Sequence, residues 1–178
     1  VIAAAKHFPG RGDSAVDAHH ACPTLDVDME RLRKVELYPY RYLIEAGLDA
    51  VMVAHCLYPQ VDDKISTVSR PIVTEILRGE LGFDGLITTD SMTMGALIDR
   101  YGVGESCARA LAAGADTVLM KAENQWRGEM FYTIENWVED GRIPMAELDD
   151  KVRRVLKVKL DYGLFDNFGM VDPELADE

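Results

Sequence analysis

Short apolar runs rich in β-branched residues recur along the chain, and each is followed by a longer stretch with a helical pattern of apolar and polar positions. The runs cover residues 1–5, 50–54, 85–89 and 116–120. A continuous apolar run of this length is typical of a strand that is buried on both faces of a parallel sheet. We therefore predict parallel strands at these four positions.

The stretches between and after the runs have the periodicity of amphipathic helices. The predicted helices cover residues 29–46, 69–81, 105–113, 127–140 and 145–162. The first contains Pro39, which must kink or split it, and it ends before Gly47, as helices commonly do. The last carries an apolar stripe from Leu148 to Leu160.

Strands that alternate with helices predict an α/β fold, which is either a doubly wound parallel sheet or a (β/α)8 TIM-type barrel. The predicted strands start roughly 30 to 50 residues apart, which suits barrel units with loops of uneven length. Four βα units make only half of a closed barrel, and a half barrel leaves two strand edges open. We therefore expect the remaining strands to come from sequence outside this chain or from another chain.

Polar side chains follow the predicted strands where each one ends. They are Lys6, His7, His55, Asp90 and Lys121. Residues at the carboxyl ends of barrel strands face the mouth in which barrel enzymes carry their active sites. The sequence therefore predicts a functional site at this edge of the sheet.

Composition narrows the function without defining it. Of the 178 residues, 48% are hydrophobic and 28% are charged, which is ordinary for a globular chain, and the net charge of −12 disfavours a nucleic-acid partner. No apolar run approaches the roughly 20 residues that a membrane-spanning helix needs. The three widely spaced cysteines are expected to be free thiols. Because the chain opens on VIAAAKHF, without an initiator Met or a signal peptide, we expect it to be the middle of a longer polypeptide.

Asp90 and a histidine loop are the candidates for chemistry. Asp90 follows an apolar strand, where a carboxylate either caps the next helix or serves as a nucleophile or metal ligand. Asp17 and His19, two residues apart in VDAHH, have the outline of an acid/base dyad in which the carboxylate holds the imidazole. A carboxylate nucleophile in a barrel mouth, together with a separate proton donor, is the set of catalytic groups that a retaining glycosidase uses.

Metal and nucleotide sites are the weaker interpretations of the same segment. His7, Asp13, Asp17, His19 and His20 offer ligands, but they lack the spacing of common metal motifs. The glycines of PGRG can form an anion-binding nest, yet no dinucleotide or P-loop pattern follows them. We expect no metal and no cofactor.

Two long motifs resemble those of one enzyme family. The stretch KHFPGRGDSAVDAHHACP resembles the K-H-F-P-G loop of family 3 glycoside hydrolases of the β-N-acetylglucosaminidase (NagZ) type, and LGFDGLITTDSMTMGAL resembles their nucleophile segment. Their order and spacing also match, and the resemblance covers nearly the whole chain. It implies that the chain is the C-terminal half of a (β/α)8 catalytic domain over residues 1–165, followed by a tail or linker over 166–178.

The resemblance also implies roles for individual residues. Asp90 would be the nucleophile, His19 the acid/base on a mobile loop, and Asp17 its orienting partner. Lys6 and His7 would contact sugar hydroxyls. The family's pocket would also include His55 beside these two residues.

The implied activity is the retaining hydrolysis of terminal β-linked N-acetylglucosamine from peptidoglycan-derived or chitin-derived fragments. Alternatives within the family are a phosphorylase or a β-glucosidase, and an alternative of another class is a non-catalytic sugar-binding or assembly module. The resemblance places such proteins in the bacterial cytoplasm, with export as the alternative. Ala18 stands where the family usually has Ser or Thr, Arg11 often corresponds to His, and the first barrel half is absent, so the 178 residues alone should not be a competent enzyme.

Overall fold

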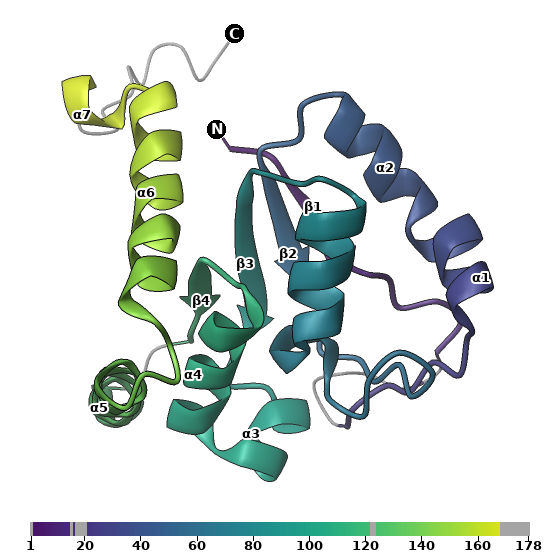
Figure 1. The fold of residues 1–178 in the computed structure, drawn as a ribbon. Coiled ribbons are helices and arrows are strands. Elements are labelled where there is room, and N and C mark those ends of the chain that lie inside the picture. Colours follow the sequence, from purple (N-terminus) through teal and green to yellow (C-terminus); the bar gives the residue numbers. More distant parts are fainter. Residues whose placement is uncertain (1, 15, 17–20, 122–123, 168–178) are drawn as a thin grey trace, which may run out of the picture.

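The computed structural model describes residues 2–14, 16, 21–121 and 124–167 of the chain. Within these ranges, four strands form one parallel sheet in the order β1-β2-β3-β4 (Figure 1). The strands are β1 (Ala4–Phe8), β2 (Ala50–Val53), β3 (Leu86–Ser91) and β4 (Thr117–Leu119). Neighbours in sequence are neighbours in the sheet, as successive βα units require. The predicted α/β class is therefore confirmed.

Helical segments connect the strands. They are α1 (Met29–Arg31), η1 (Leu32–Glu36), α2 (Tyr38–Glu45), η2 (Ser66–Val68), η3 (Pro71–Glu80), α3 (Gly95–Tyr101), α4 (Val103–Ala113), α5 (Asn124–Glu139), α6 (Met145–Asp161) and α7 (Leu164–Asn167). The five predicted helices are present with shifted ends. The first is divided into three segments, and Pro39 lies in the first turn of α2, where a missing N–H costs little.

Two predictions need correction. The first strand begins at Ala4, three residues after the predicted start, and it includes Lys6 and His7, which were expected to follow it. Phe8 extends the strand because its side chain is fully buried in the core. Helix α3 was not predicted, since it has only 7 residues and lies between two glycines, Gly95 at its start and Gly102 at its end.

The two faces of the sheet differ in burial. On one face, Phe8, Val51, Val53 and Ile87 are fully buried in the main apolar core. On the other, the register aligns Lys6, Met52, Thr88 and Thr117 in one row, and all four are at least partly exposed. A parallel sheet is normally covered on both faces. The open face is therefore the one that the rest of a barrel would enclose.

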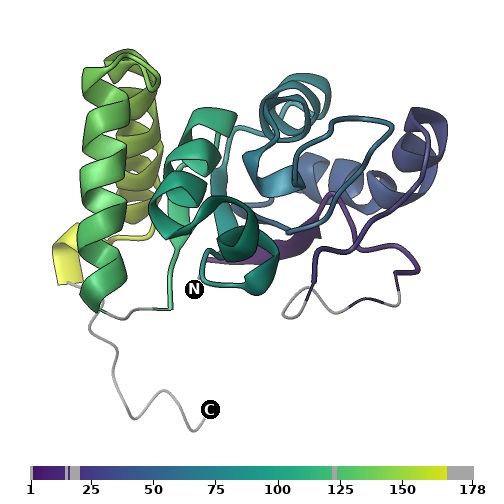
Figure 2. The same ribbon diagram turned by 90° about the horizontal axis from the view of Figure 1, so that it is seen from below.

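The outermost helical segments carry further exposed apolar side chains. Figure 2 shows the N-terminal helical segments and α6 at opposite ends of the molecule. Tyr38 and Tyr42 of α2 are mostly exposed, and so is Leu160, at the end of the predicted stripe of α6. Surfaces of this kind commonly mark a contact with another part of a protein.

The structure also bears on membrane-spanning helices, metal sites and cysteines. In the described part of the chain, no helix is both long and apolar enough to cross a membrane. Within the same ranges, there is no group of three or more His, Cys, Asp or Glu side chains that could hold a metal ion. The three cysteines, Cys22, Cys56 and Cys107, are free, as predicted.

Candidate active site

Asp90 lies at the carboxyl end of β3, one residue before the strand ends. Its side chain is 17% exposed, so one edge of the carboxylate is accessible to a ligand. Oδ1 accepts a hydrogen bond from the backbone N–H of Ser91 at 2.8 Å. The alternative role as a helix cap is wrong, because α3 begins at Gly95 with Met94 as its N-cap residue.

Two cationic or polar side chains from the N-terminal segment reach the same carboxylate. Arg11 Nη2 donates to Asp90 Oδ2 at 3.1 Å, and His7 Nε2 lies 3.4 Å from that oxygen. The register between β1 and β2 shifts between Lys6 and Phe8, which leaves His7 without a partner on β2. Such irregularities re-aim side chains, and this one places His7 beside Asp90.

The pKa of His7 is lowered from its ordinary value of 6.5, first by burial and then by the positive charge of Arg11. The negative charge of Asp90 opposes this effect. His7 is therefore neutral at neutral pH. A neutral imidazole with a donor nitrogen suits hydrogen bonds to a sugar hydroxyl or to a carboxylate.

His55 lies fully buried between the ends of β2 and β3. Its Nε2 is 3.0 Å from the carbonyl oxygen of Ser91, and its Nδ1 is 2.6 Å from Thr67 Oγ1. Because a carbonyl only accepts, Nε2 carries the proton that makes the first bond. Burial lowers the pKa of His55, which favours the neutral ring. His55 thus connects the end of β3 to η2.

A cavity of about 570 Å³ adjoins the site, between the loop after β1 and the η1–α2 segment. Lys6, His7 and Arg11 line it. A hydrogen bond fixes the loop, since Tyr58 Oη donates to the carbonyl oxygen of Gly10 at 2.8 Å. Glu36 packs under the same loop: a Cβ on Gly10 would lie 3.0 Å from its Cγ.

The predicted site residues are brought together only in part. Lys6, His7 and Asp90 lie at one edge of the sheet, as expected. His55 lies beside them in space, but both of its ring nitrogens are engaged by protein groups, the carbonyl oxygen of Ser91 and the hydroxyl of Thr67. Its role in lining a sugar pocket therefore stays a prediction. Asp17 and His19 lie outside the described residues.

Sequence reasoning missed several residues that shape the site. Arg11 had no assigned role, yet it makes the hydrogen bond to Asp90. Thr67, Tyr58 and Glu36 gave no signal, because a hydroxyl or carboxylate inside an apolar stretch resembles an ordinary surface position. Their contacts join segments that are 12 or more residues apart in the sequence.

Comparison with known families identifies the chain. The family model described as "Glycosyl hydrolase family 3 N terminal domain" matches residues 1–158. The chain belongs to glycosyl hydrolase family 3. The two quoted motifs therefore lie in a family 3 domain, as the resemblance implied.

Curated family 3 relatives are bacterial proteins named β-hexosaminidase. One from Chromobacterium violaceum is 38% identical over 120 residues, covering 67% of this chain and 34% of that protein. One from Pseudomonas aeruginosa PAO1 is 44% identical over 124 residues, covering 67% of this chain and 36% of that protein. The chain thus spans about a third of the length of these relatives.

Solved family 3 structures superpose on nearly the whole chain. A family 3 β-N-acetylglucosaminidase from Paenibacillus sp. FPU-7 is 40% identical with a TM-score of 0.91, covering 97% of this chain and 33% of that chain. A β-glucoside phosphorylase, BglX, is 26% identical with a TM-score of 0.89, also covering 97% of this chain and 33% of its own. These structures contain barrel domains. This chain corresponds to a part of such a domain.

Proposed function

We propose that the chain is the nucleophile-bearing part of a family 3 β-hexosaminidase that removes terminal β-linked N-acetylglucosamine. The observation that carries the proposal is the placement of Asp90 at the strand end, with His7 and Arg11 against its Oδ2. The names of the curated relatives support the reaction class. The substrates we propose are fragments derived from peptidoglycan or chitin, in the bacterial cytoplasm.

The proposed reaction has two displacements at the anomeric carbon. Asp90 attacks this carbon while His19 gives a proton to the departing glycosidic oxygen, and a covalent glycosyl-enzyme forms. Asp17 holds His19 in the tautomer that can donate. Water then attacks the same carbon and loses a proton to His19, and the bond to Asp90 breaks with its electron pair returning to the carboxylate.

The surroundings of Asp90 suit a nucleophile that must stay ionised and correctly aimed. The Ser91 N–H and the Arg11 guanidinium each donate to a different carboxylate oxygen. Hydrogen bonds of this kind fix the orientation of the carboxylate. The partial exposure of Asp90 leaves an approach for the sugar from the open side of the sheet.

Sugar recognition is proposed for Lys6 and His7. Lys6 is exposed in the open row of β1, so its ammonium is available to a ligand. The lowered pKa of His7 keeps a neutral ring beside Asp90, where it can exchange a hydrogen bond with a sugar hydroxyl.

The active unit in this proposal is larger than the chain. The row that contains Lys6 and Met52 is open, and the outer faces of α2 and α6 expose apolar side chains. A closed barrel would cover these surfaces and complete the sugar pocket. The division at residues 165 and 166 into catalytic domain and tail remains a prediction.

A phosphorylase is the second candidate, supported by the likeness to BglX. In that reaction phosphate replaces water as the acceptor in the second step. The Arg11 guanidinium, whose side chain is 35% exposed beside Asp90, offers a cation that an incoming phosphate can approach.

The test is turnover of an aryl β-N-acetylglucosaminide by the intact protein, in buffers with and without phosphate. We expect hydrolysis without phosphate, its abolition in Asp90→Ala, and a loss of about 10²–10⁴-fold in His19→Ala, with the larger losses for poor leaving groups. Asp99→Asn, which alters an exposed carboxylate of α3, is the matched control.

Other results redirect the proposal. Turnover that requires phosphate and releases a sugar phosphate would favour the phosphorylase. Sugar binding without turnover by the wild-type protein, unchanged except in affinity by Asp90→Ala, would favour the non-catalytic module.

A further inference from the structure

A second cluster of charges lies at the opposite end of the sheet from Asp90. Asp116, directly before β4, is buried with no exposed side-chain surface. Its Oδ2 accepts from Arg78 Nη2 at 2.6 Å and from the N–H of Ile87 at 2.8 Å, while its Oδ1 accepts from Arg154 Nη1 at 2.6 Å. These bonds join η3 and α6 to the amino-terminal end of the sheet.

The two arginines share one carboxylate, so the cluster carries an excess of positive charge. Arg78 Nη1 is already used, because it donates to the carbonyl oxygens of Phe83 and Gly85. Arg154 differs: in the described ranges, its Nη1 is bonded to Asp116 and its other nitrogens have no protein partner. Arg154 therefore keeps N–H donors for a further ligand.

Lys151 adds a further positive charge at this end of the sheet. It is only 4% exposed, and within the described residues it forms neither a hydrogen bond nor an ion pair. Burial lowers its pKa, and the repulsion from Arg154 and Arg78 adds to that effect, against the attraction of Asp116 and Glu147. A lysine whose side chain is mostly buried and has no bonded anionic partner is disfavoured in its charged form.

A cavity of about 270 Å³ brings these donors together. Its lining consists of Arg70, Thr74, Arg78, Gly114, Glu147, Asp150, Lys151 and Arg154. The two acidic groups at the rim do not neutralise the interior, since Glu147 lies 3.6 Å from Arg70 and Asp150 is paired with Arg153. Four cationic and two anionic side chains line the cavity, so its lining carries an excess of positive charge.

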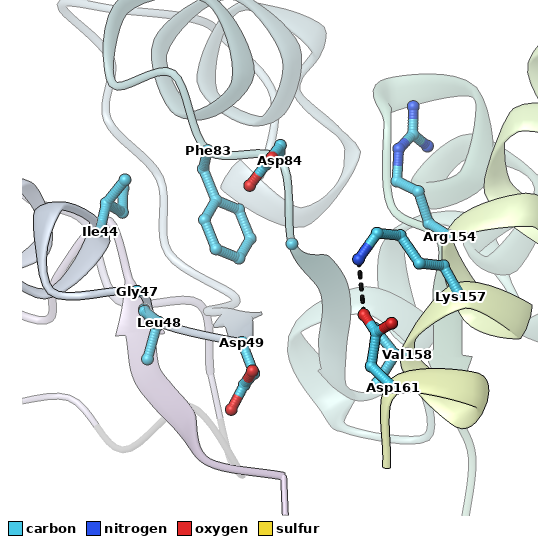
Figure 3. A pocket seen from close by; sticks show the side chains of 11 residues that line it. Ile44, Gly47, Leu48, Asp49, Phe83, Asp84, Arg154, Lys157, Val158 and Asp161 are labelled. Atoms are coloured by element: carbon cyan, nitrogen blue, oxygen red, sulfur yellow. Dashed lines mark hydrogen bonds and ion pairs between the residues drawn. The ribbon is translucent and has the colours of Figure 1, made fainter. Parts of the chain in front are cut away.

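The neighbouring cavity in Figure 3 shows the contrast. It has a volume of about 240 Å³, and α6 contributes Arg154 and Lys157 to its wall. There Lys157 pairs with Asp161 at 2.5 Å, and Asp49 and Asp84 face the same space. In this cavity Lys157 has a carboxylate partner, whereas Lys151 has none among the described residues.

We propose that the Lys151 cavity binds a small oxyanion of the phosphate class, with Lys151 Nζ and the unused nitrogens of Arg154 as donors. Phosphate oxygens accept several charge-assisted hydrogen bonds at once, which matches this donor set. The bound anion would compensate the buried charge. This site does not depend on the proposed hydrolase activity, because it lies at the other end of the sheet.

The test is calorimetric titration of the intact protein with inorganic phosphate, at constant ionic strength maintained with chloride. We expect binding by the wild type, at least 10-fold weaker binding by Lys151→Met, and binding retained by Lys151→Arg. Lys157→Met is the matched control, an exposed lysine six residues further along α6, and it should bind phosphate as the wild type does.

Two further results make the outcome decisive. Without phosphate, Lys151→Met should melt no lower than the wild type, because the change removes an unpaired buried charge, so a folded variant is available for the titration. Equal phosphate affinity in Lys151→Met and the wild type would overturn the proposal. So would binding that is lost in Arg11→Met but kept in Lys151→Met, since that pattern assigns phosphate to the Asp90 site.

Discussion

Replacing His55 with alanine tests whether the buried histidine positions Asp90, the proposed nucleophile. The imidazole is fully buried, and it bonds the carbonyl oxygen of Ser91 on one side and the hydroxyl of Thr67 on the other. Losing one hydrogen bond and leaving its buried partner unsatisfied costs about 1–3 kcal/mol, and the cavity adds to that. We expect His55→Ala to lower the free energy of unfolding by about 3–4 kcal/mol.

The effect on catalysis follows from the position of Ser91. This residue accepts from His55 through its carbonyl oxygen and donates to Asp90 Oδ1 through its N–H. Releasing the end of β3 therefore displaces the Asp90 carboxylate. A misplacement of about 1 Å at a reacting group can cost roughly 10²-fold in rate. The expected fall in kcat is of that order, with KM changed much less.

The assay combines thermal unfolding with steady-state kinetics, in which kcat is expressed per folded active site. Thr67→Val is the matched comparison, because it removes one of the two partners of His55 and leaves the bond to Ser91. It should lose stability but keep most of kcat. If folded His55→Ala had wild-type kcat, the positioning argument would be refuted, and His55 would serve only the packing of the core.

Three further predictions concern stability. Asp116→Ala should cost about 3–5 kcal/mol, because two guanidinium groups and a backbone N–H lose their buried acceptor, and the midpoint of chemical denaturation measures the loss. The folded pKa of His55 lies below its ordinary value of 6.5, so the unfolded chain takes up a proton first as the pH falls. Stability should therefore be complete above pH 6.5 and decline below it, and His55→Gln should flatten this decline in melting curves recorded across pH. Gly12→Ala should destabilise by about 1–2 kcal/mol, since φ is +49° and a Cβ would lie 2.4 Å from Leu25 Cδ2. Gly128→Ala, in the open interior of α5, should instead stabilise by about 0.5–1 kcal/mol, and the opposite signs of the two changes are the check.

The apolar pattern predicted the sheet because short continuous apolar runs rich in β-branched residues have a strong local signature. It placed the start and end of β1 wrongly, since Lys6 and His7 interrupt the apolar run although the backbone remains extended to Phe8. A strand that carries polar residues of a site lacks the continuous apolar run by which buried strands are predicted. Helix α3 was missed because its 7 residues are too few for a periodic pattern.

The site was predictable where a motif met a strand end, and not where distant segments touch. Asp90 and His7 were indicated by their positions at strand ends, and the structure places His7 Nε2 3.4 Å from Asp90 Oδ2. The bond between Arg11 and Asp90 joins residues 79 positions apart, and the bond between His55 and Ser91 spans 36. Neither pairing is encoded in a local pattern, because the register of the sheet and the path of the loop decide which side chains meet.

The most direct measurement of the central claim is the site of covalent attachment in the intact protein. The protein is treated with an activated fluorinated β-N-acetylglucosaminide, whose fluorine slows release of the sugar, and is then digested and analysed by mass spectrometry. We expect one sugar per active site, attached to Asp90 and absent in Asp90→Ala. Attachment to another residue, or rapid turnover by Asp90→Ala, would contradict it.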